Sequence, residues 1–235
     1  MATHTATALV LLFVFRNDWK NIAIGMWQSL RARAVKASNP YGKLGWLLIT
    51  ATIPAGIMGL LFEEQLKNLF AAPRLVAEAL TANGLLLLGA DFLRRRQNKI
   101  VRDGGEGDLR IAKSTWTAAV KVGVMQCLAL IPGFSRTGST ITGGLLTGLA
   151  YEDAARFSFL LATPIILAAS VLKLPELLID TSATFSIGPL IAGSIAAGIC
   201  AYLSVCFLLR YFETKKLMPF GIYCIAIGLI GLLAI

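Results

Sequence analysis

Charged side chains, histidines and paired cysteines are all scarce in this chain. Asp, Glu, Lys and Arg make up 15% of its 235 residues, whereas a soluble domain carries about 25%. This composition excludes an ordinary water-soluble globular protein. The single histidine, His4, excludes any site that needs several histidines. The four cysteines lie inside apolar segments without C-x-x-C spacing, which is typical of small buried side chains.

Long apolar runs take the place of charge. Hydrophobic residues make up 56% of the chain, and its mean hydropathy is +0.71. Several runs approach the roughly 20 residues that a helix needs to cross the hydrocarbon core. We therefore predict an all-α polytopic membrane protein, a helix bundle in which residues 1–235 form one transmembrane domain. Its apolar segments are expected at about 3–15, 44–62, 75–93, 115–131, 141–150, 157–172, 187–209 and 220–235.

The basic residues predict how the chain crosses the membrane. The net charge is +9, but Lys and Arg cluster in short loops between apolar segments, so the excess indicates orientation and not a nucleic-acid partner. The basic segments 16–43, 94–113 and 210–219 are expected in the cytoplasm. Segment 16–36, with Trp19 and Trp27, is expected to be an amphipathic helix at the membrane surface.

One apolar region, 115–150, is interrupted by the sequence IPGFSRTGST at residues 131–140. The segment after the interruption, 141–150, would cover only about 15 Å as a helix, half the hydrocarbon thickness. The charge pattern allows either three crossings from residue 94 to residue 186 or one re-entrant hairpin plus one crossing. We favour a re-entrant hairpin, of the kind found in inverted-repeat membrane proteins, in which broken helices aim their N-termini at anions.

The interruption has the side chains of a phosphate site. Pro132 ends the first arm, and the free backbone amides at the start of the second arm attract anions. Arg136 adds a planar, permanently charged fork that suits phosphate oxygens. Thr137, Ser139 or Thr140 is expected to cap the returning helix at residue 141. The alternative is an interfacial loop whose arginine reaches lipid headgroups, but the surrounding hydroxyls and glycines favour a site.

The stretch VGVMQCLALIPGFSRTGSTITGGLLTGLAYEDAARFSFLLATPIILAAS resembles the signature of the undecaprenyl-diphosphatase family, the bacitracin-resistance phosphatases of bacterial membranes. Segments 52–70 and 201–223 fit the same family pattern. The resemblance implies a multi-pass protein of the bacterial inner membrane that hydrolyses undecaprenyl diphosphate at the periplasmic face. It also implies recycling of the lipid carrier for cell-wall synthesis, and bacitracin resistance.

The resemblance also implies roles for individual residues. Ser135 and Arg136 are the expected catalytic residues, and Arg136 would grip the diphosphate of the polyisoprenyl lipid. The residues expected to bind the diphosphate are Gly133, Ser135, Arg136, Thr137, Gly138, Ser139, Thr140 and Gln126.

The chain departs from the family pattern at its beginning. Members usually carry an earlier re-entrant segment with a Glu-rich motif and a Pro-x-Ser-Ser-Thr-Gly-His run, which supplies a histidine and the carboxylates for a divalent cation, Mg²⁺ or Ca²⁺. This chain contains no such run, so the cation is expected from the resemblance alone. We expect an N-terminally truncated chain that keeps one half of a two-part site. A start assigned too late is favoured over a decayed paralogue, because the retained half matches the motif.

Other ionisable residues are weaker candidates. Glu63, Glu64, Glu78 and Asp91 are expected near the headgroups at segment ends, and His4 is expected to be structural or incidental. Lys121 stands within an apolar segment, where a lysine either has a partner or extends to the interface.

A second hypothesis is a lipid-diphosphate binding protein or transporter without hydrolysis. The absence of the early motif favours it, as does the inverted-repeat architecture. A histidine-based lipid phosphatase is excluded, since His4 is the only histidine. Small residues at 144 and 148, and from 192 to 201, permit close helix packing and would suit a homodimer.

Overall fold

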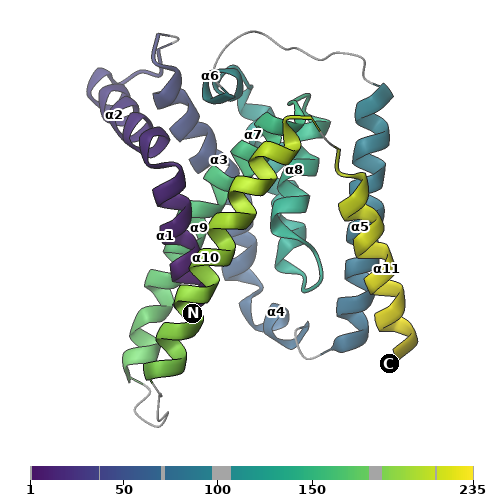
Figure 1. Ribbon diagram of the computed structural model, residues 1–235. Helices are drawn as coiled ribbons and strands as arrows, with labels where there is room; N and C mark the ends of the chain where they lie inside the picture. Colours follow the sequence, from purple (N-terminus) through teal and green to yellow (C-terminus); the bar gives the residue numbers. More distant parts are fainter. Residues whose placement is uncertain are drawn as a thin grey trace.

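The computed structural model describes residues 2–36, 38–69, 72–96, 107–179, 187–214 and 216–234. Throughout these ranges the secondary structure is helical (Figure 1). The α-helices are α1 (Ala2–Val14), α2 (Arg16–Ala32), α3 (Pro40–Leu61), α4 (Glu63–Leu69), α5 (Pro73–Arg96), α6 (Gly107–Ala112), α7 (Trp116–Cys127), α8 (Arg136–Leu146), α9 (Tyr151–Ile179), α10 (Ile187–Phe212) and α11 (Met218–Ala234). A short 3-10 turn, Leu128–Leu130, extends α7.

Among the described residues, four helices are long and apolar enough to cross a membrane, namely α3, α5, α9 and α10. Shorter apolar helices are found at Thr3–Val14, Trp116–Leu130 and Met218–Ala234. Large apolar side chains are freely exposed on the outside of the bundle, for example Leu60 at 73% and Leu203 at 60%. Such surfaces are unfavourable in water but suit contact with lipid tails. The prediction of an all-α, multi-pass membrane protein is confirmed, and each predicted apolar segment corresponds to a helix.

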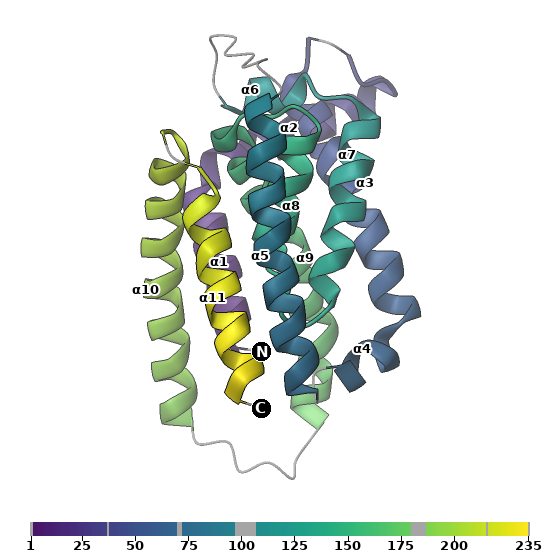
Figure 2. The same ribbon diagram turned by 90° about the vertical axis from the view of Figure 1, so that its right-hand side faces the viewer.

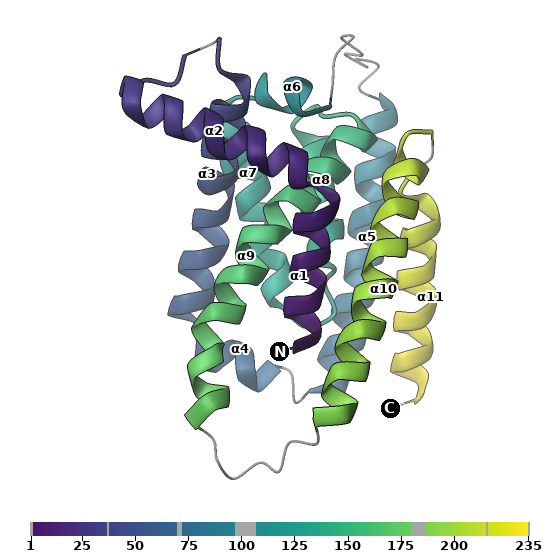
Figure 3. The same ribbon diagram turned by 60° about the vertical axis from the view of Figure 1, so that its left-hand side comes forward.

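The helices pack as neighbouring groups around a central hairpin. Helix α1 lies beside α9 and α10 (Figure 3), while α5 and α11 form a close pair at the other side of the bundle. The α5–α11 pair is close because glycines face each other, so that a Cβ on Gly84 would stand 2.7 Å from the carbonyl oxygen of Gly221. The α7–α8 hairpin lies between these groups and contacts α3, α5 and α9.

Helix α2 lies across one end of the bundle, as Figure 3 shows. Two side-chain hydrogen bonds hold it there. Trp46 Nε1 on α3 donates to Ser29 Oγ at 2.7 Å, and Nδ2 of Asn39, the residue before α3, donates to the carbonyl oxygen of Gly25 at 2.7 Å. Trp27 on its outer face is 70% exposed. The predicted amphipathic surface helix is therefore confirmed.

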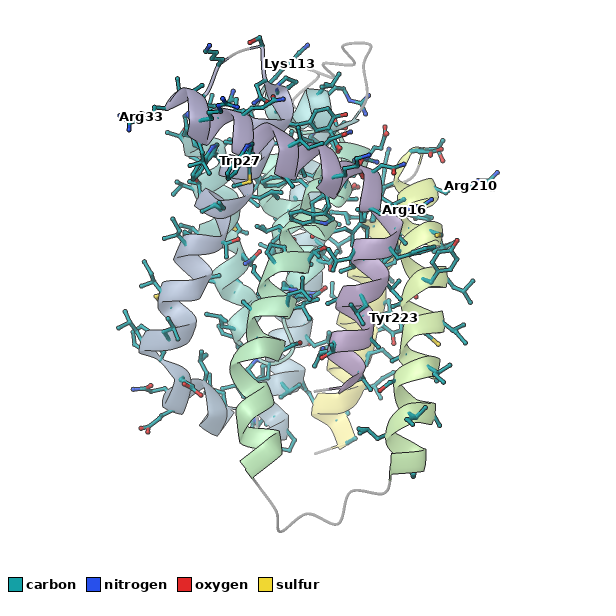
Figure 4. The ribbon with its side chains drawn as sticks, turned by 90° about the vertical axis from the view of Figure 1, so that its left-hand side faces the viewer. Arg16, Trp27, Arg33, Lys113, Arg210 and Tyr223 are labelled. Atoms are coloured by element: carbon teal, nitrogen blue, oxygen red, sulfur yellow. The ribbon has the colours of Figure 1, made fainter. Side chains whose placement is uncertain are left out.

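The basic side chains gather at the same end of the molecule. Figure 4 shows Arg16, Arg33, Lys113 and Arg210 toward the end where α2 lies. These residues come from the three basic segments, 16–43, 94–113 and 210–219, that are expected on one side of the membrane. The three segments therefore lie toward the same end of the bundle, while the assignment of that end to the cytoplasm stays a prediction.

The α7–α8 region is a hairpin that does not cross the bundle. Figure 2 shows its turn ending short of the end of α5 that lies away from α2, and Figure 1 agrees. Helix α8 has 11 residues, and at 1.5 Å per residue it extends about 16 Å, half the hydrocarbon thickness. The prediction of a re-entrant hairpin within 115–150 is thus confirmed, and of the two crossing patterns the hairpin is the one adopted. The inverted-repeat relation stays a prediction.

Candidate diphosphate site at the break between α7 and α8

The break is shaped by one proline and one glycine. Pro132 follows the last turn of the first arm, and Gly133 then takes a φ of +101°, which L side chains rarely adopt. Gly133 also lies against the backbone of α5, where an added Cβ would collide with the carbonyl oxygen of Val76 and stand 3.0 Å from the amide nitrogen of Leu80. The turn is therefore pressed directly onto a spanning helix.

Ser135 starts the returning helix. Its backbone is extended (φ −75°, ψ 121°), and its Oγ accepts a hydrogen bond from the amide of Gly138 at 3.1 Å. The capping prediction was wrong: α8 begins at Arg136 and not at residue 141, because Ser135 supplies the cap that was assigned to Thr137, Ser139 or Thr140. The amides of Arg136 and Thr137, in the first turn, have no acceptor within the helix. They are the natural anion donors of this helix start.

Arg136 is half-buried at this helix start. Its Nε is buried and has no hydrogen-bond partner among the residues that the structure describes. Three more buried polar atoms of the hairpin are in the same condition within the described chain: Oε1 of Gln126 on α7, and the hydroxyls of Ser139 and Thr142 on α8. Buried polar groups are nearly always paired with protein or water. A cluster of unpaired ones is typical of a site that receives a polar ligand or ordered water.

The remaining predicted residues divide into two sets. Ser135 is exposed, and Thr137 is half-buried beside Arg136, so both stand at the helix start with Gly138. Thr140 is buried, and its hydroxyl donates to the carbonyl oxygens of Arg136 at 2.9 Å and Thr137 at 3.0 Å. Thr140 also contacts the hydroxyl of Ser158 on α9. Its hydroxyl is thus engaged within the protein, while its diphosphate-binding role stays a prediction.

Asn83 is a residue of this region that the sequence analysis missed. It lies on α5 with no exposed surface, and its Oδ1 accepts a hydrogen bond from the backbone amide of Ser135 at 3.3 Å. The available signal was a single polar amide in the otherwise apolar run around 79–90. Sequence alone could not connect it to the break, because the two residues are 52 positions apart.

The chain is similar to known proteins over most of its length. A family model described as bacitracin resistance protein BacA matches residues 1–230. The chain belongs to this family. An undecaprenyl-diphosphatase 2 of Chromobacterium violaceum is 45% identical over 233 residues, which cover 98% of this chain and 80% of that protein. An undecaprenyl-diphosphatase of Mycolicibacterium paratuberculosis is 44% identical over 236 residues, covering 96% and 76%. An undecaprenyl-diphosphatase 1 of Burkholderia pseudomallei is 42% identical over 230 residues, covering 97% and 78%.

The acidic candidates are dispersed in this member of the BacA family. Glu63 and Glu64 are exposed at the start of α4, and Glu78 is exposed and paired with Arg74 at 3.3 Å. Asp91 is buried near the end of α5 and accepts a hydrogen bond from the hydroxyl of Tyr151, the first residue of α9, at 2.6 Å. Its expected position near the headgroups stays a prediction.

The two remaining basic candidates lie on the surface of the bundle. Lys121 is exposed on α7, and His4 is exposed on α1. Among the described residues, no group of three or more His, Cys, Asp or Glu side chains is close enough to hold a metal ion. The divalent cation that the resemblance implies therefore has no such cluster of ligands in the described part of the chain, and it stays a prediction.

Ion pairs are concentrated away from the break, at the end of the bundle where α2 lies. Arg156 on α9 is bound by Asp18 of α2, with Nη2 to Oδ2 at 2.8 Å, and by Asp108 of α6. Arg110 on α6 is bound by Asp153, with Nη2 to Oδ1 at 2.7 Å, and by a second acidic neighbour on α9. Hydrogen bonding to Asp153, opposed by burial, raises the pKa of Arg110. These arginines tie α2, α6 and α9 together.

Proposed function

We propose that this chain hydrolyses undecaprenyl diphosphate to undecaprenyl phosphate and inorganic phosphate. Its membership of the BacA family and its similarity to three proteins named undecaprenyl-diphosphatase support the proposal. The observation that carries it is Arg136: a half-buried guanidinium at the start of a half-depth helix, with a buried Nε that no described residue satisfies. An arginine in such a position within a membrane bundle is a site for an anion.

The substrate's shape matches the site's position. A polyisoprenyl diphosphate has its tail in the bilayer and its anhydride at the headgroup boundary, so the donors that bind it must lie at membrane depth. Arg136 donates to the phosphate oxygens, and the amides of Arg136 and Thr137 add two further donors. Ser135 Oγ accepts from Gly138 but keeps its own O–H to donate to the substrate.

These residues position the anhydride and neutralise charge, which are the main contributions to phosphoryl transfer. Water attacks the terminal phosphorus, the bond from that phosphorus to the bridging oxygen breaks, and the bridging oxygen leaves with the lipid phosphate. The guanidinium and amides stabilise the charge that gathers on the phosphate oxygens during this step.

The reaction takes place on the periplasmic side of a bacterial inner membrane. Two observations support this orientation. The basic residues gather at the end where α2 lies, which the positive-inside rule assigns to the cytoplasm. The hairpin starts from that end and carries its turn most of the way toward the other, so the turn is closer to the outer face.

Phosphate release from undecaprenyl diphosphate by the purified full chain in detergent tests the proposal. We expect Arg136→Ala to lower kcat/KM by about a hundred-fold or more, because a charged donor to the transition state is lost. Arg136→Lys keeps the charge without the planar fork and is expected to fall between wild type and the alanine variant. Arg74→Ala is the matched control: its arginine is exposed and pairs with Glu78 on the same helix.

The outcomes separate the enzyme from a binding protein. Release that depends on Arg136 and not on Arg74 supports hydrolysis. Arg136-dependent binding of undecaprenyl diphosphate without any release contradicts hydrolysis and favours the lipid-diphosphate carrier. Release that is unchanged in Arg136→Ala contradicts the assignment of the site.

A further inference from the structure

Asn83 is a polar side chain at a buried position, where an apolar side chain would be buried at a lower free-energy cost. It lies in the middle of α5, wholly buried, in a helix that crosses the membrane. Burying an amide is unfavourable unless its hydrogen bonds are made. What Asn83 bonds to therefore indicates why it is there.

The amide of Asn83 joins two separate parts of the fold. Its Oδ1 accepts from the backbone N–H of Ser135 at 3.3 Å, and its Nδ2 donates to the Sγ of Cys224 on α11 at 3.4 Å. A backbone N–H can only donate, so the oxygen of the side chain must face Ser135. The Nδ2 group consequently faces α11.

The bond to Ser135 acts at the residue that starts α8. Ser135 caps the helix through its Oγ, and its own N–H precedes the two amides left free at the helix start. Gly133 contacts the same helix one turn earlier, against Val76 and Leu80. Helix α5 thus holds the break at two points, through a backbone contact at Gly133 and a side-chain hydrogen bond at Ser135.

We propose that Asn83 is a positioning residue for the diphosphate reaction: it fixes the Ser135 amide, and through it the direction in which Arg136 and the free amides of α8 point. This inference rests on the proposed function. Catalysis of phosphoryl transfer by positioning is sensitive to displacements of about 1 Å. A turn held at Gly133 alone can rotate about that contact.

The α5–α11 pair has other contacts that do not involve Asn83. Gly84 lies against Gly221, and Gly228 lies against Thr81. Removing the Asn83 oxygen therefore leaves the pairing of these helices in place while it releases the turn. This separation makes a positioning role distinguishable from a structural one.

The first test replaces Asn83 by Leu, which has a similar size but no acceptor. In phosphate release from undecaprenyl diphosphate we expect kcat to fall by roughly ten-fold or more, with KM within about three-fold of wild type. Cys224→Ala removes only the other hydrogen bond of the amide, and Thr81→Ala weakens only the α5–α11 contact. Both controls are expected to keep kcat within about two-fold.

The second test uses Asn83→Asp, which is nearly isosteric. A buried carboxyl group stays neutral at low pH, and its carbonyl oxygen still accepts from Ser135. As the group ionises, its charge opposes the diphosphate. We expect the kcat of this variant, divided by the wild-type value at the same pH, to approach one near pH 5 and to fall toward pH 8. The leucine variant is expected to show no such trend.

Several results would overturn the inference. One is a folded Asn83→Leu protein, judged by its melting temperature, with wild-type kcat. Another is an aspartate variant as inactive as the leucine variant at every pH. If the leucine variant is not recovered folded, Asn83→Ala repeats the measurement.

If the wild-type chain binds the lipid diphosphate without turnover, the proposed function fails separately. The same variants are then compared by Kd, where an unchanged Kd for Asn83→Leu overturns the positioning role.

Discussion

Arg156 and Arg136 are both half-buried in the same bundle, in opposite surroundings. Arg156 is bound by Asp18 and Asp108 from two other helices and lies 5.6 Å from the centre of the Phe15 ring. Arg136 has no ion-pair partner among the described residues, and its Nε is buried and unsatisfied. Arg156 is thus bound by protein carboxylates, whereas Arg136 keeps a buried donor that no described residue satisfies.

The difference separates structural from functional charge. A buried cation whose donors are all used by the protein joins helices, and its loss destabilises the fold. A buried cation with unused donors costs stability, so it is retained for what it binds. We therefore expect substitutions at the ion pairs of Arg156 and Arg110 to act on folding and those at the break to act on turnover.

The largest effect on stability is expected at Arg156. Arg156→Ala leaves two largely buried carboxylates without their cation and is expected to lower the unfolding free energy by about 3–5 kcal/mol. Arg136→Ala is expected to change it by less than about 1 kcal/mol, because no ion pair to a described residue is lost. Detergent-based unfolding measures both, with the exposed Arg16→Ala as a control. Equal losses at Arg156 and Arg136 would contradict the comparison.

The next effect is expected at the turn itself. Gly133→Ala combines a positive φ with a collision against α5, and we expect a loss of about 2–4 kcal/mol together with lowered activity. Gly148→Ala is the matched control, since Gly148 has a φ of +100° but open space around it. It isolates the backbone strain, which costs about 1–2 kcal/mol. If the two variants unfold alike, the contact with Val76 has no energetic importance.

A smaller effect is expected where α8 meets α9. Ser158→Ala removes the hydroxyl that contacts Thr140 and donates to the carbonyl oxygen of Thr137 at 3.4 Å. The expected loss is about 1 kcal/mol of unfolding free energy. Ser194→Ala, whose exposed hydroxyl bonds only within α10, is expected to change it by less than about 0.5 kcal/mol. A loss for Ser158→Ala no larger than the loss for Ser194→Ala would contradict a stabilising contact between α8 and α9 at Ser158.

The smallest effect is a pH dependence at Asp18 on α2. Burial, then the nearby carboxylate of Asp108, raises the pKa of Asp18 to about 6, although Arg156 opposes the shift. Between pH 4 and 6 the folded state therefore holds a proton that the unfolded state has lost, so the unfolding free energy decreases as the pH rises through about 6.

The Asp18→Asn variant measures that dependence. Its amide cannot ionise, so the difference in melting temperature between variant and wild type is expected to grow in favour of the variant from pH 5 to 7.5. The change corresponds to less than about 1 kcal/mol, because Asp18, unlike Asp108, keeps part of its side chain in contact with solvent. A difference that is constant over this pH range would contradict the raised pKa.

Much of the architecture was predictable because the membrane restricts what an apolar chain can do. Hydropathy located the spanning helices, the basic residues predicted a common end for their segments, and the length of 141–150 indicated a hairpin that turns back within the membrane. The residues of the break could be named as candidates because phosphate binding needs particular donors. The helix start was misplaced, since serine and threonine are both favoured as caps and residue type alone did not choose between Ser135 and Thr137.

By itself, the sequence determined the class of protein, its likeness to the BacA family and the chemistry available at residues 131–140. These properties depend on composition and on residues that are neighbours in the chain. Only the tertiary structure decided that Arg156 has carboxylate partners while Arg136 has an unsatisfied Nε, and that Asn83 reaches Ser135. The physical reason is that such contacts join helices 18 to 138 residues apart, and their energies depend on packing geometry, which no local pattern encodes.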